Sequence, residues 1–508
     1  MSLLTEYTTH ADALRHFDGA ALWNLFDGDR AHLNISHECI DRWAGDPARA
    51  AIRIAHADGR DEVLSFADLS VWAARFAHWL AREGVQPGDR VAIMLDPSLA
   101  FYAALFGTMK YGAVAVPLFT LFGPDGVRLR VDDCLPVLLL TEAGIGPLPA
   151  TRVVTPDDAF LRALTAFPGE YTATTSADAM ALYQYTSGTT RDLPEAVKHT
   201  HRAVVVVCAA ALYGTGVRPG DRFFCPSSPA WGHGLWHGTL APLALGVSTG
   251  TMSGRFDPER LLRALSEYKI DNLSAAATHY RMMKNSGAAN RYPTTLKKMS
   301  FTGEPVDSET LAFAEAHFGA RLCSMYGTTE IGVILADFPG AADHTPKPGA
   351  LGKPIPGLRL RVEAPDGTEC PPDQTGEIKV WRHGTWLPTK DRGRVDPAGY
   401  FWHAGRADDV IISAGWTIGP AEVEDAIMKH PAVAEAAVIG VPDPLRGQIV
   451  KAFVVAKAIA TPGLAEEIQA LVRSRLSQHE YPRAIEFVDS LPKTPAGKVN
   501  RKILRERT

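Results

Sequence analysis

Residues 185–190, Tyr-Thr-Ser-Gly-Thr-Thr, have the composition of a loop that binds phosphate. Hydroxyl side chains flank the glycine, and a short apolar run at residues 179–183 comes just before them. Backbone N–H and side-chain O–H groups can donate to a polyanion, and glycine lets a phosphate approach the main chain. Alone, the same pattern also fits an ordinary Ser/Thr-rich turn. The phosphate-binding candidates are Thr186, Ser187, Gly188, Thr189 and Thr190.

Further polar blocks follow this segment at wide spacing along the chain. Each block alone is a weak signal, because short motifs often occur by chance. Their presence together and in one order is what carries the argument. The blocks are Gly303-Glu304-Pro305, Tyr326-Gly327-Thr328-Thr329-Glu330, Thr389-Lys390-Asp391, Gly405-Arg406-Ala407-Asp408-Asp409 and Pro495-Ala496-Gly497-Lys498.

The order of these blocks resembles that of the adenylate-forming superfamily, which includes acyl-CoA synthetases, adenylation domains of peptide synthetases and firefly-type luciferases. The resemblance covers roughly residues 61–505. Such enzymes join a carboxylate to ATP, release pyrophosphate and pass the acyl adenylate to a thiol. The blocks are most similar to those of medium-chain and aromatic acyl-CoA synthetases. The resemblance therefore implies an ATP-dependent acyl-CoA ligase that uses ATP, Mg²⁺ and CoA.

The resemblance also implies a role for each nucleotide-binding block. Tyr326 would lie against the adenine, where an aromatic face contributes dispersion, and Thr329 would donate to the α-phosphate. Glu330 would hold Mg²⁺, which prefers carboxylate and phosphate oxygens. Asp391 and Arg406 would contact the ribose, since a carboxylate accepts hydrogen bonds from both hydroxyls. The remaining members of the nucleotide site would be Gly303, Glu304, Pro305, Gly327 and Thr328.

Lys498 receives the central catalytic role from the resemblance. It would bridge the acid's carboxylate and the α-phosphate, because an ammonium between two anions cancels their repulsion. The segment around it is basic and is predicted to be flexible. Asp408 would be the hinge about which a C-terminal domain rotates between the half-reactions. Gly415 would let the pantetheine arm of CoA pass close to the main chain.

The chain departs from the family pattern next to the hydroxyl-rich segment and next to the ribose aspartate. The family usually continues the first with Gly-x-Pro-Lys, whereas this run is one residue longer and has Glu195 at the lysine position. A glutamate would repel the β- and γ-phosphates unless it turned away or met a cation. Arg191 or Lys198 could supply that charge. Lys390 stands where a glycine usually precedes the aspartate.

The acid pocket is less readable than the nucleotide site. Residues 228–234 align with the block in which acyl-CoA synthetases carry Gly-Trp or an aromatic gate. His233 and His237 are predicted to be structural, because a reactive mixed anhydride needs no acid–base catalyst. The predicted pocket-lining residues are Trp231, Gly232, Ala276, Thr278, Tyr280 and Thr302.

A layered α/β scaffold is expected to position these groups. Ser65 and Asp68 read as a capping box, and apolar residues then recur at helical spacing up to Gly84. Strand–helix–strand units of this length imply buried parallel strands. The pattern continues with a strand at 91–95, a helix at 99–110 and a strand at 113–118, and it recurs at 203–276.

The second half of the chain changes in character. Glycine and proline become frequent between about residues 346 and 402, which indicates short antiparallel strands in a small β subdomain. After Gly405 a helix beginning at Pro420, two strands, a helix and a last strand predict a small α+β unit. We expect a large domain at 1–407 that binds acid and ATP, and a small mobile α+β domain at 408–508 that carries Lys498.

Composition excludes several other classes of protein. The 508 residues carry a net charge of −5, which gives no electrostatic reason to expect nucleic acid or an anionic membrane as partner. The cysteines are scattered without a C-x-x-C pair, so a disulfide framework or thiolate metal site is not expected. The longest apolar run, at 203–213, is too short to span a bilayer. Because the sequence shows no signal-peptide pattern, we expect a cytoplasmic protein. The sequence leaves the oligomeric state open.

Alternative functions remain at this point. A ligase of the same chemistry could load a carrier protein in trans instead of CoA, or could activate an unusual oxyacid. A nucleotide-binding protein without turnover is an alternative of another class. Only Glu195 supports it, and the retained Lys498, Asp391 and Glu330 argue against it.

Overall fold

The computed structural model describes most of the chain, in two compact units. The first unit comprises Met1–Pro348 with Pro354–Gly357, and the second comprises Gly349–Lys353 with Leu358–Thr508. Each unit is described by itself. The described residues are 3–122, 124–142, 144, 148, 150–185, 196–328, 331–382, 384–406, 411–413, 416–443, 446–476, 481–494 and 497–508.

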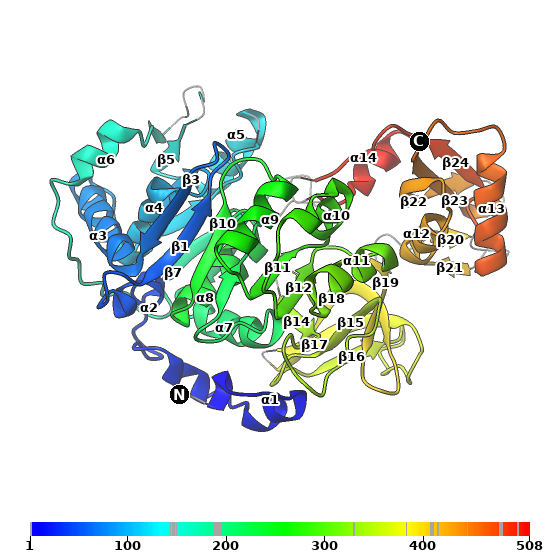
Figure 1. The fold of residues 1–508 in the computed structure, drawn as a ribbon, viewed down its shortest axis with the longest axis horizontal. Coiled ribbons are helices and arrows are strands. Elements are labelled where there is room, and N and C mark those ends of the chain that lie inside the picture. Colours follow the sequence, from blue (N-terminus) through cyan, green and yellow to red (C-terminus); the bar gives the residue numbers. More distant parts are fainter. Residues whose placement is uncertain are drawn as a thin grey trace. The chain divides into compact units, whose positions relative to one another are not determined.

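One sheet of the first unit has the strand order β6-β5-β3-β4-β7-β8, and its strands β3, β5 and β7 are labelled in Figure 1. Its strands are parallel except for the antiparallel pair β7–β8. Helix α4 packs against β3 and β4, which confirms the predicted strand–helix–strand unit. The strands are β3 (Arg90–Met94), β4 (Val114–Pro117), β5 (Leu138–Thr141), β6 (Arg152–Val154), β7 (Met180–Tyr185) and β8 (Ala196–Thr200).

The other sheet of the first unit has the order β14-β13-β12-β11-β9-β10-β1-β2. Strands β13 through β1 in this order are parallel, whereas β14 and β2 are antiparallel to their neighbours. The strands are β1 (Ala50–Ala55), β2 (Asp61–Ser65), β9 (Arg222–Phe224), β10 (Ser248–Met252), β11 (Asn272–Ala276), β12 (Lys298–Thr302), β13 (Leu322–Thr328) and β14 (Gly332–Ala336).

Helices cover these sheets, and the first helix predicted from the sequence is confirmed in detail. Helix α3 begins with the capping box of Ser65 and Asp68 and buries Leu69, Ala73 and Leu80. The helices of the first unit are α1 (His10–His16), α2 (Ile35–Cys39), α3 (Phe66–Arg82), α4 (Leu99–Tyr111), α5 (Pro124–Cys134), α6 (Asp158–Leu164), α7 (Ala203–Gly214), α8 (Ala241–Ala244), α9 (Pro258–Glu267), α10 (Ala277–Ser286) and α11 (Ser308–Phe318).

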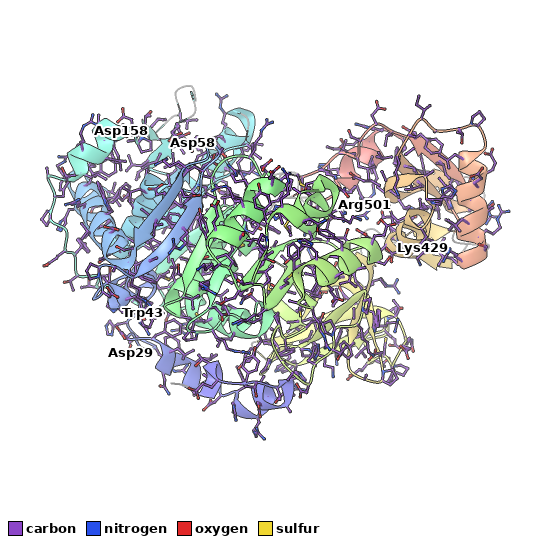
Figure 2. The ribbon with its side chains drawn as sticks, in the orientation of Figure 1. Asp29, Trp43, Asp58, Asp158, Lys429 and Arg501 are labelled. Carbon is purple, nitrogen blue, oxygen red and sulfur yellow. The ribbon has the colours of Figure 1, made fainter. Side chains whose placement is uncertain are left out.

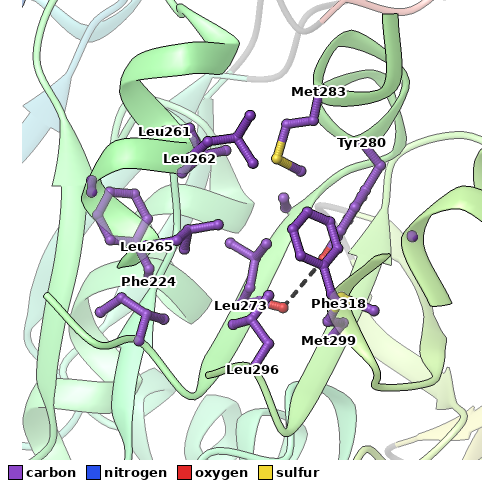
Figure 3. Close-up of a cluster of buried hydrophobic side chains, with 14 of the residues drawn as sticks. Phe224, Leu261, Leu262, Leu265, Leu273, Tyr280, Met283, Leu296, Met299 and Phe318 are labelled. Carbon is purple, nitrogen blue, oxygen red and sulfur yellow. Dashed lines mark hydrogen bonds between the residues drawn. The ribbon is translucent and has the colours of Figure 1, made fainter. Parts of the chain in front are cut away.

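The core beneath α9, α10 and α11 fixes the part of the sheet that matters most here. Leucines of α9, Met283 of α10 and Phe318 of α11 pack on Leu273 and Met299 of the strands (Figure 3). All of these side chains are buried. Burying an aliphatic or aromatic side chain contributes about 1.5–3 kcal/mol. The carboxyl ends of β11 and β12 are therefore held on a rigid base.

Among its described residues, the second unit contains one antiparallel arrangement of strands, a second sheet that includes one parallel pair, and three helices. The order β16-β17-β18-β19-β15 confirms the predicted short antiparallel strands, and β21-β20-β23-β22 forms another sheet in which β24 pairs with β23. The strands are β15 (Ala350–Pro354), β16 (Leu360–Glu363), β17 (Gly376–Arg382), β18 (Thr385–Val395), β19 (Phe401–Arg406), β20 (Ile411–Ser413), β21 (Trp416–Ile418), β22 (Val433–Asp443), β23 (Gly447–Ala456) and β24 (Ala484–Phe487).

The helices of the second unit agree with the sequence prediction. Helix α12 (Pro420–Met428) begins at the proline, and its Val423 and Ile427 are fully buried against α13 (Leu464–Arg475) and the adjacent sheet. Helix α14 (Arg501–Glu506) buries Leu504. The compact units divide near residue 348. The functional boundary between residues 407 and 408 stays a prediction.

The structure also shows where the cysteines and the longest apolar run lie. Cys39, Cys134, Cys208, Cys225, Cys323 and Cys370 are free thiols with buried side chains. The run at 203–213 forms most of α7. Across the part of the chain that the structure describes, no helix has both the length and the apolar character needed to cross a membrane.

Candidate active site

The carboxyl ends of β11 and β12 bring two predicted blocks together. Ala276 and Thr302, the last residues of these parallel strands, are paired across the sheet. Just beyond them, the Thr278 hydroxyl donates to the Glu304 carboxylate. Parallel α/β sheets bind their ligands at the carboxyl ends of strands. We call Ala276, Thr278, Thr302 and Glu304 the strand-edge cluster.

A cation on α10 completes the polar side of the strand-edge cluster. The guanidinium of Arg281 lies 3.3 Å from the Glu304 carboxylate and 3.5 Å from that of Asp307. The Thr310 N–H also donates to Asp307, at 2.8 Å, and these contacts lower the pKa of Asp307 although burial opposes them. Glu304 is therefore oriented by neighbours before any ligand binds. Gly303 and Pro305 flank it in the turn that follows β12.

The predicted adenine block lies on the next strand. Tyr326, Gly327 and Thr328 end β13, and each is half-buried. A Cβ on Gly327 would lie 2.1 Å from the carbonyl oxygen of Gly332 on β14, so glycine is required by this close approach. The neighbouring strands β12 and β13 thus bring Tyr326 to the same edge as the strand-edge cluster. Thr329 and Glu330 lie outside the described residues.

The predicted acid-pocket block begins a π-helical segment, His233–Leu240. Trp231 and Gly232 are half-buried just before it. A Cβ on Gly232 would lie 2.7 Å from Nε2 of Gln184, and Trp236 Nε1 donates to Oε1 of Gln184 at 2.9 Å. Gln184, which sequence reasoning missed, therefore joins this block to the end of β7. π-Helical turns are rare and occur frequently at functional sites.

His233 belongs to a buried chain of polar groups, as predicted for a structural histidine. Its Nδ1 contacts the Ser227 hydroxyl at 2.9 Å, and its Nε2 contacts that of Ser274 at 2.8 Å. Ser300 donates to Ser274 at 2.8 Å. Burial holds the pKa of His233 well below its usual range, so the ring is neutral. Sequence reasoning missed these serines, although for Ser274 and Ser300 a small polar residue within a buried strand is the signal that could have found them.

Tyr280 lies in the core rather than beside the other pocket candidates. Its ring is fully buried in the cluster of Figure 3, and its hydroxyl donates to the carbonyl oxygen of Ser300 at 3.0 Å. The helical position of Tyr280 on α10 turns it away from the direction of Thr278, two residues earlier. Its contacts are those of a residue that supports β11 and β12 from below.

The ribose candidate Asp391 lies on β18 of the second unit and is 5% exposed. Its Cα pairs with that of Arg406 on β19, so the structure brings both ribose candidates together. His403, which sequence reasoning missed, places Nε2 3.5 Å from the Asp391 carboxylate. Lys390 has a φ of 62°, a left-handed conformation that favours glycine. This explains physically why glycine is usual at that position.

Lys498 is exposed, but its backbone is held by hydrogen bonds to Thr494. The Thr494 N–H donates to the Lys498 carbonyl at 2.7 Å, and the Lys498 N–H donates to Thr494 Oγ1 at 3.3 Å. Arg501, labelled in Figure 2, places its guanidinium 2.8 Å from the Glu424 carboxylate of α12. We call residues 491–494 and 497–504 the Lys498 segment. It is anchored at both ends instead of forming a loose tail.

Several predicted residues lie outside the described residues. They are Thr186, Ser187, Gly188, Thr189, Thr190, Arg191, Glu195, Thr329, Glu330, Asp408 and Gly415. Lys198, which could supply the missing phosphate-loop charge, is exposed on β8 with its ammonium 5.2 Å from the ring centre of Tyr183. Within the described ranges there is no group of three or more His, Cys, Asp or Glu side chains that could hold a metal ion.

Comparison with known proteins gives the same assignment along nearly the whole chain. The family described as AMP-binding enzyme matches residues 40–387, and the AMP-binding enzyme C-terminal domain matches residues 422–498. An acetyl-coenzyme A synthetase of Bacillus subtilis is 31% identical over 98% of this chain and 94% of its own length.

Solved structures are similar over comparable lengths. An acyl-CoA synthetase of Brucella canis has 32% identity and a TM-score of 0.75, with 99% of each chain covered. A benzoate CoA ligase of Burkholderia xenovorans LB400 has 26% identity and a TM-score of 0.79, with 93% of this chain and 99% of that chain covered.

Proposed function

Because the chain belongs to the AMP-binding enzyme family and is an AMP-forming acid–CoA ligase, we propose that its acid is aromatic or medium-chain. ATP and CoA are its co-substrates. One relative is named for acetate and a structural neighbour for benzoate, so the residues around the acid decide the choice within a common chemistry. The half-buried Trp231 and the small Ala276 favour an acid larger than acetate.

The strand-edge cluster is the observation that supports binding of the acid and the nucleotide side by side. Acid-pocket candidates and adenine-block candidates lie at one edge of one sheet, linked by the pair Ala276–Thr302 and the contact Thr278–Glu304. Tyr326 on β13 extends the same edge. An acid and a nucleotide bound along adjacent strands would be held close to each other and oriented for reaction.

The first half-reaction joins the acid to the nucleotide. A carboxylate oxygen of the acid bonds to the α-phosphorus of ATP, and the bond to the pyrophosphate oxygen breaks. Both reactants are anions, so catalysis is mostly positioning and charge neutralisation. We assign this neutralisation to Lys498, Thr329 and the hydroxyl groups of residues 186–190. Mg²⁺ would be held by Glu330 and the phosphates, since it is usually bound through only one or two carboxylates.

The second half-reaction transfers the acyl group. The CoA sulfur bonds to the acyl carbon of the acyl-AMP, and AMP leaves.

We assign ribose binding to Asp391 and Arg406, whose strands are paired in the second unit. Asp408 would be the hinge between the two half-reactions, and Gly415 would border the path of the pantetheine arm.

A panel of carboxylic acids tests this function. The purified protein would be mixed with ATP, Mg²⁺ and one acid, with and without CoA, while AMP and pyrophosphate are measured. We expect AMP release that requires both an aromatic or medium-chain acid and CoA. Acyl-AMP that accumulates regardless of CoA would favour transfer to a carrier protein. Pyrophosphate release that does not depend on any acid of the panel would contradict the proposal.

A further inference from the structure

The histidines around the predicted acid pocket differ from one another in their hydrogen bonding. His233 and His237 lie on the π-helical segment, and their ring centres are 6.4 Å apart. The ring centres of Trp231 and His233 are 5.4 Å apart. His279 follows Thr278 on α10 and stacks on Phe256 at 4.2 Å.

His237 and His279 carry buried nitrogen atoms that lack a partner. The Nδ1 atom of each ring is inaccessible to solvent and has no hydrogen-bond partner among the residues that the structure describes. His237 is 6% exposed, whereas both nitrogens of His233 are paired with serines. Burial lowers the pKa of His237 and of His279 to about 4, so both rings are neutral near pH 7.

An unpaired nitrogen of this kind has an energetic cost that a ligand can remove. Leaving a buried donor or acceptor unsatisfied costs about 1–3 kcal/mol, and native structures pair nearly all such groups. A pocket for an unsubstituted hydrocarbon chain would gain nothing from imidazoles at this position. A pocket that must recognise a polar substituent would use them, because neutral imidazole can both donate and accept.

On the basis of the proposed function, we propose that the acid carries a hydroxyl or amino group that pairs with the imidazole of His237 or His279. The substrate class is therefore a hydroxy- or amino-substituted carboxylic acid, not a plain fatty or benzoic acid. Sites built to hydrogen-bond a substrate group reject the analogue that lacks it, because their own polar atoms are then left unpaired.

Matched acids test this proposal directly. Benzoate would be compared with its 2-, 3- and 4-hydroxy and amino derivatives, and hexanoate with 6-hydroxyhexanoate. The measured quantity is kcat/KM for CoA-dependent AMP release. We expect at least one substituted acid to exceed its parent by about tenfold or more, the value that corresponds to about 1.4 kcal/mol.

Variants of the two histidines assign the preference to its source. His237→Phe or His279→Phe should reduce the ratio of kcat/KM for the substituted acid to kcat/KM for its parent toward one. His237→Asn, whose amide keeps a hydrogen-bonding atom near the position of Nδ1, should retain part of the ratio. His317→Phe on α11 is the matched control, since that half-buried ring stacks on Phe313 away from the strand-edge cluster. It should leave the ratio unchanged.

The outcomes separate the inference from the function on which it rests. Parent acids that react as well as their substituted partners overturn the inference and leave the ligase function intact. A preference that survives both phenylalanine variants also overturns it. If no acid supports CoA-dependent AMP release, both proposals fail. The wild-type ratio alone is decisive if a variant does not fold.

Discussion

The strand-edge cluster and the Lys498 segment hold their polar groups in opposite ways. In the strand-edge cluster the side chains themselves are fixed, because Thr278 and Arg281 both contact Glu304. In the Lys498 segment the backbone is fixed by hydrogen bonds between Thr494 and Lys498, whereas the Lys498 side chain is exposed. One region presents a preorganised surface, and the other presents a charged group on a firm base.

This difference has a consequence for the effects of mutation. Groups fixed by neighbours contribute to stability and to binding together, because removing one leaves its partners unpaired. An exposed lysine contributes little to stability, and its effect is expressed where charge develops in the transition state. Substitutions in the first region should therefore change several measured properties, and substitution of Lys498 should change only one.

The largest expected effect is that of Lys498→Ala on adenylation. Loss of one group that stabilises transition-state charge lowers kcat by about 10²–10³-fold. Acid-dependent pyrophosphate release should fall by that factor, while the melting temperature and the CoA-dependent release of AMP from supplied acyl-AMP stay near wild type. Lys493→Ala is the matched control in the same segment, because Lys493 forms an exposed ion pair with Glu435. Survival of both half-reactions in Lys498→Ala would refute its assigned role.

A smaller effect is expected at the ribose candidate. Asp391→Ala removes a buried carboxylate whose hydrogen bonds to ribose hydroxyls would each contribute about 1.5–3 kcal/mol. The KM for ATP should rise by about 10–100-fold, with a smaller change in the KM for the acid. Asp373→Asn serves as the control. It removes the charge of an exposed aspartate that pairs with Arg394, a residue on the same strand as Asp391. An unchanged KM for ATP in Asp391→Ala would place the ribose elsewhere.

Local signals in the sequence predicted much of the fold, because local chemistry determines those features. The capping box of Ser65 and Asp68 and the proline at position 420 fixed the starts of α3 and α12 correctly. The layered α/β architecture and the short antiparallel strands of the small β subdomain were also predicted correctly. Family resemblance, rather than periodicity, pointed to the blocks that become the strand-edge cluster.

The remaining features depend on tertiary contacts that no local pattern encodes. The serines that pair with His233 come from separate parts of the first unit, Ser227 from the segment after β9 and Ser274 from β11, so only the tertiary fold brings them together. Tyr280 follows Thr278 by two positions on α10, and which side faces the core depends on how the helix is docked. The anchoring of the Lys498 segment depends on burial of Leu504 and on the partner of Arg501 far along the chain.

Low pH should destabilise the first unit through its buried neutral histidines His237 and His279. Burial lowers the pKa of His237 and His279 to about 4, against about 6.5 in the unfolded chain. Between these values the unfolded state binds more protons, so the free energy of unfolding falls as pH decreases from about 6.5 to about 4. The slope is at most about 1.4 kcal/mol per pH unit for each ring.

Urea unfolding at a series of pH values measures this effect. His237→Asn should flatten the slope between pH 6.5 and 4, because it removes a ring whose pKa is lowered by burial. An identical slope in wild type and His237→Asn would show that the ring is protonated in the folded state as readily as in the unfolded chain. That result would also weaken the case for a dry, neutral pocket around it.

The smallest expected effect concerns Lys390, which separates backbone strain from ligand contact beside the ribose site. Its φ of 62° costs a non-glycine residue on the order of 1 kcal/mol, while glycine adds about 0.4–1 kcal/mol of entropy to the unfolded chain. Lys390→Gly should therefore be neutral or slightly stabilising, and Lys390→Val should destabilise by about 1–3 kcal/mol. The midpoints of urea unfolding compare the two variants directly. Equal midpoints would mean that the chain relaxes this turn at no cost. The KM for ATP should stay unchanged in Lys390→Gly, because the Asp391 N–H still donates to Thr389 Oγ1 at 3.1 Å and keeps the carboxylate in place.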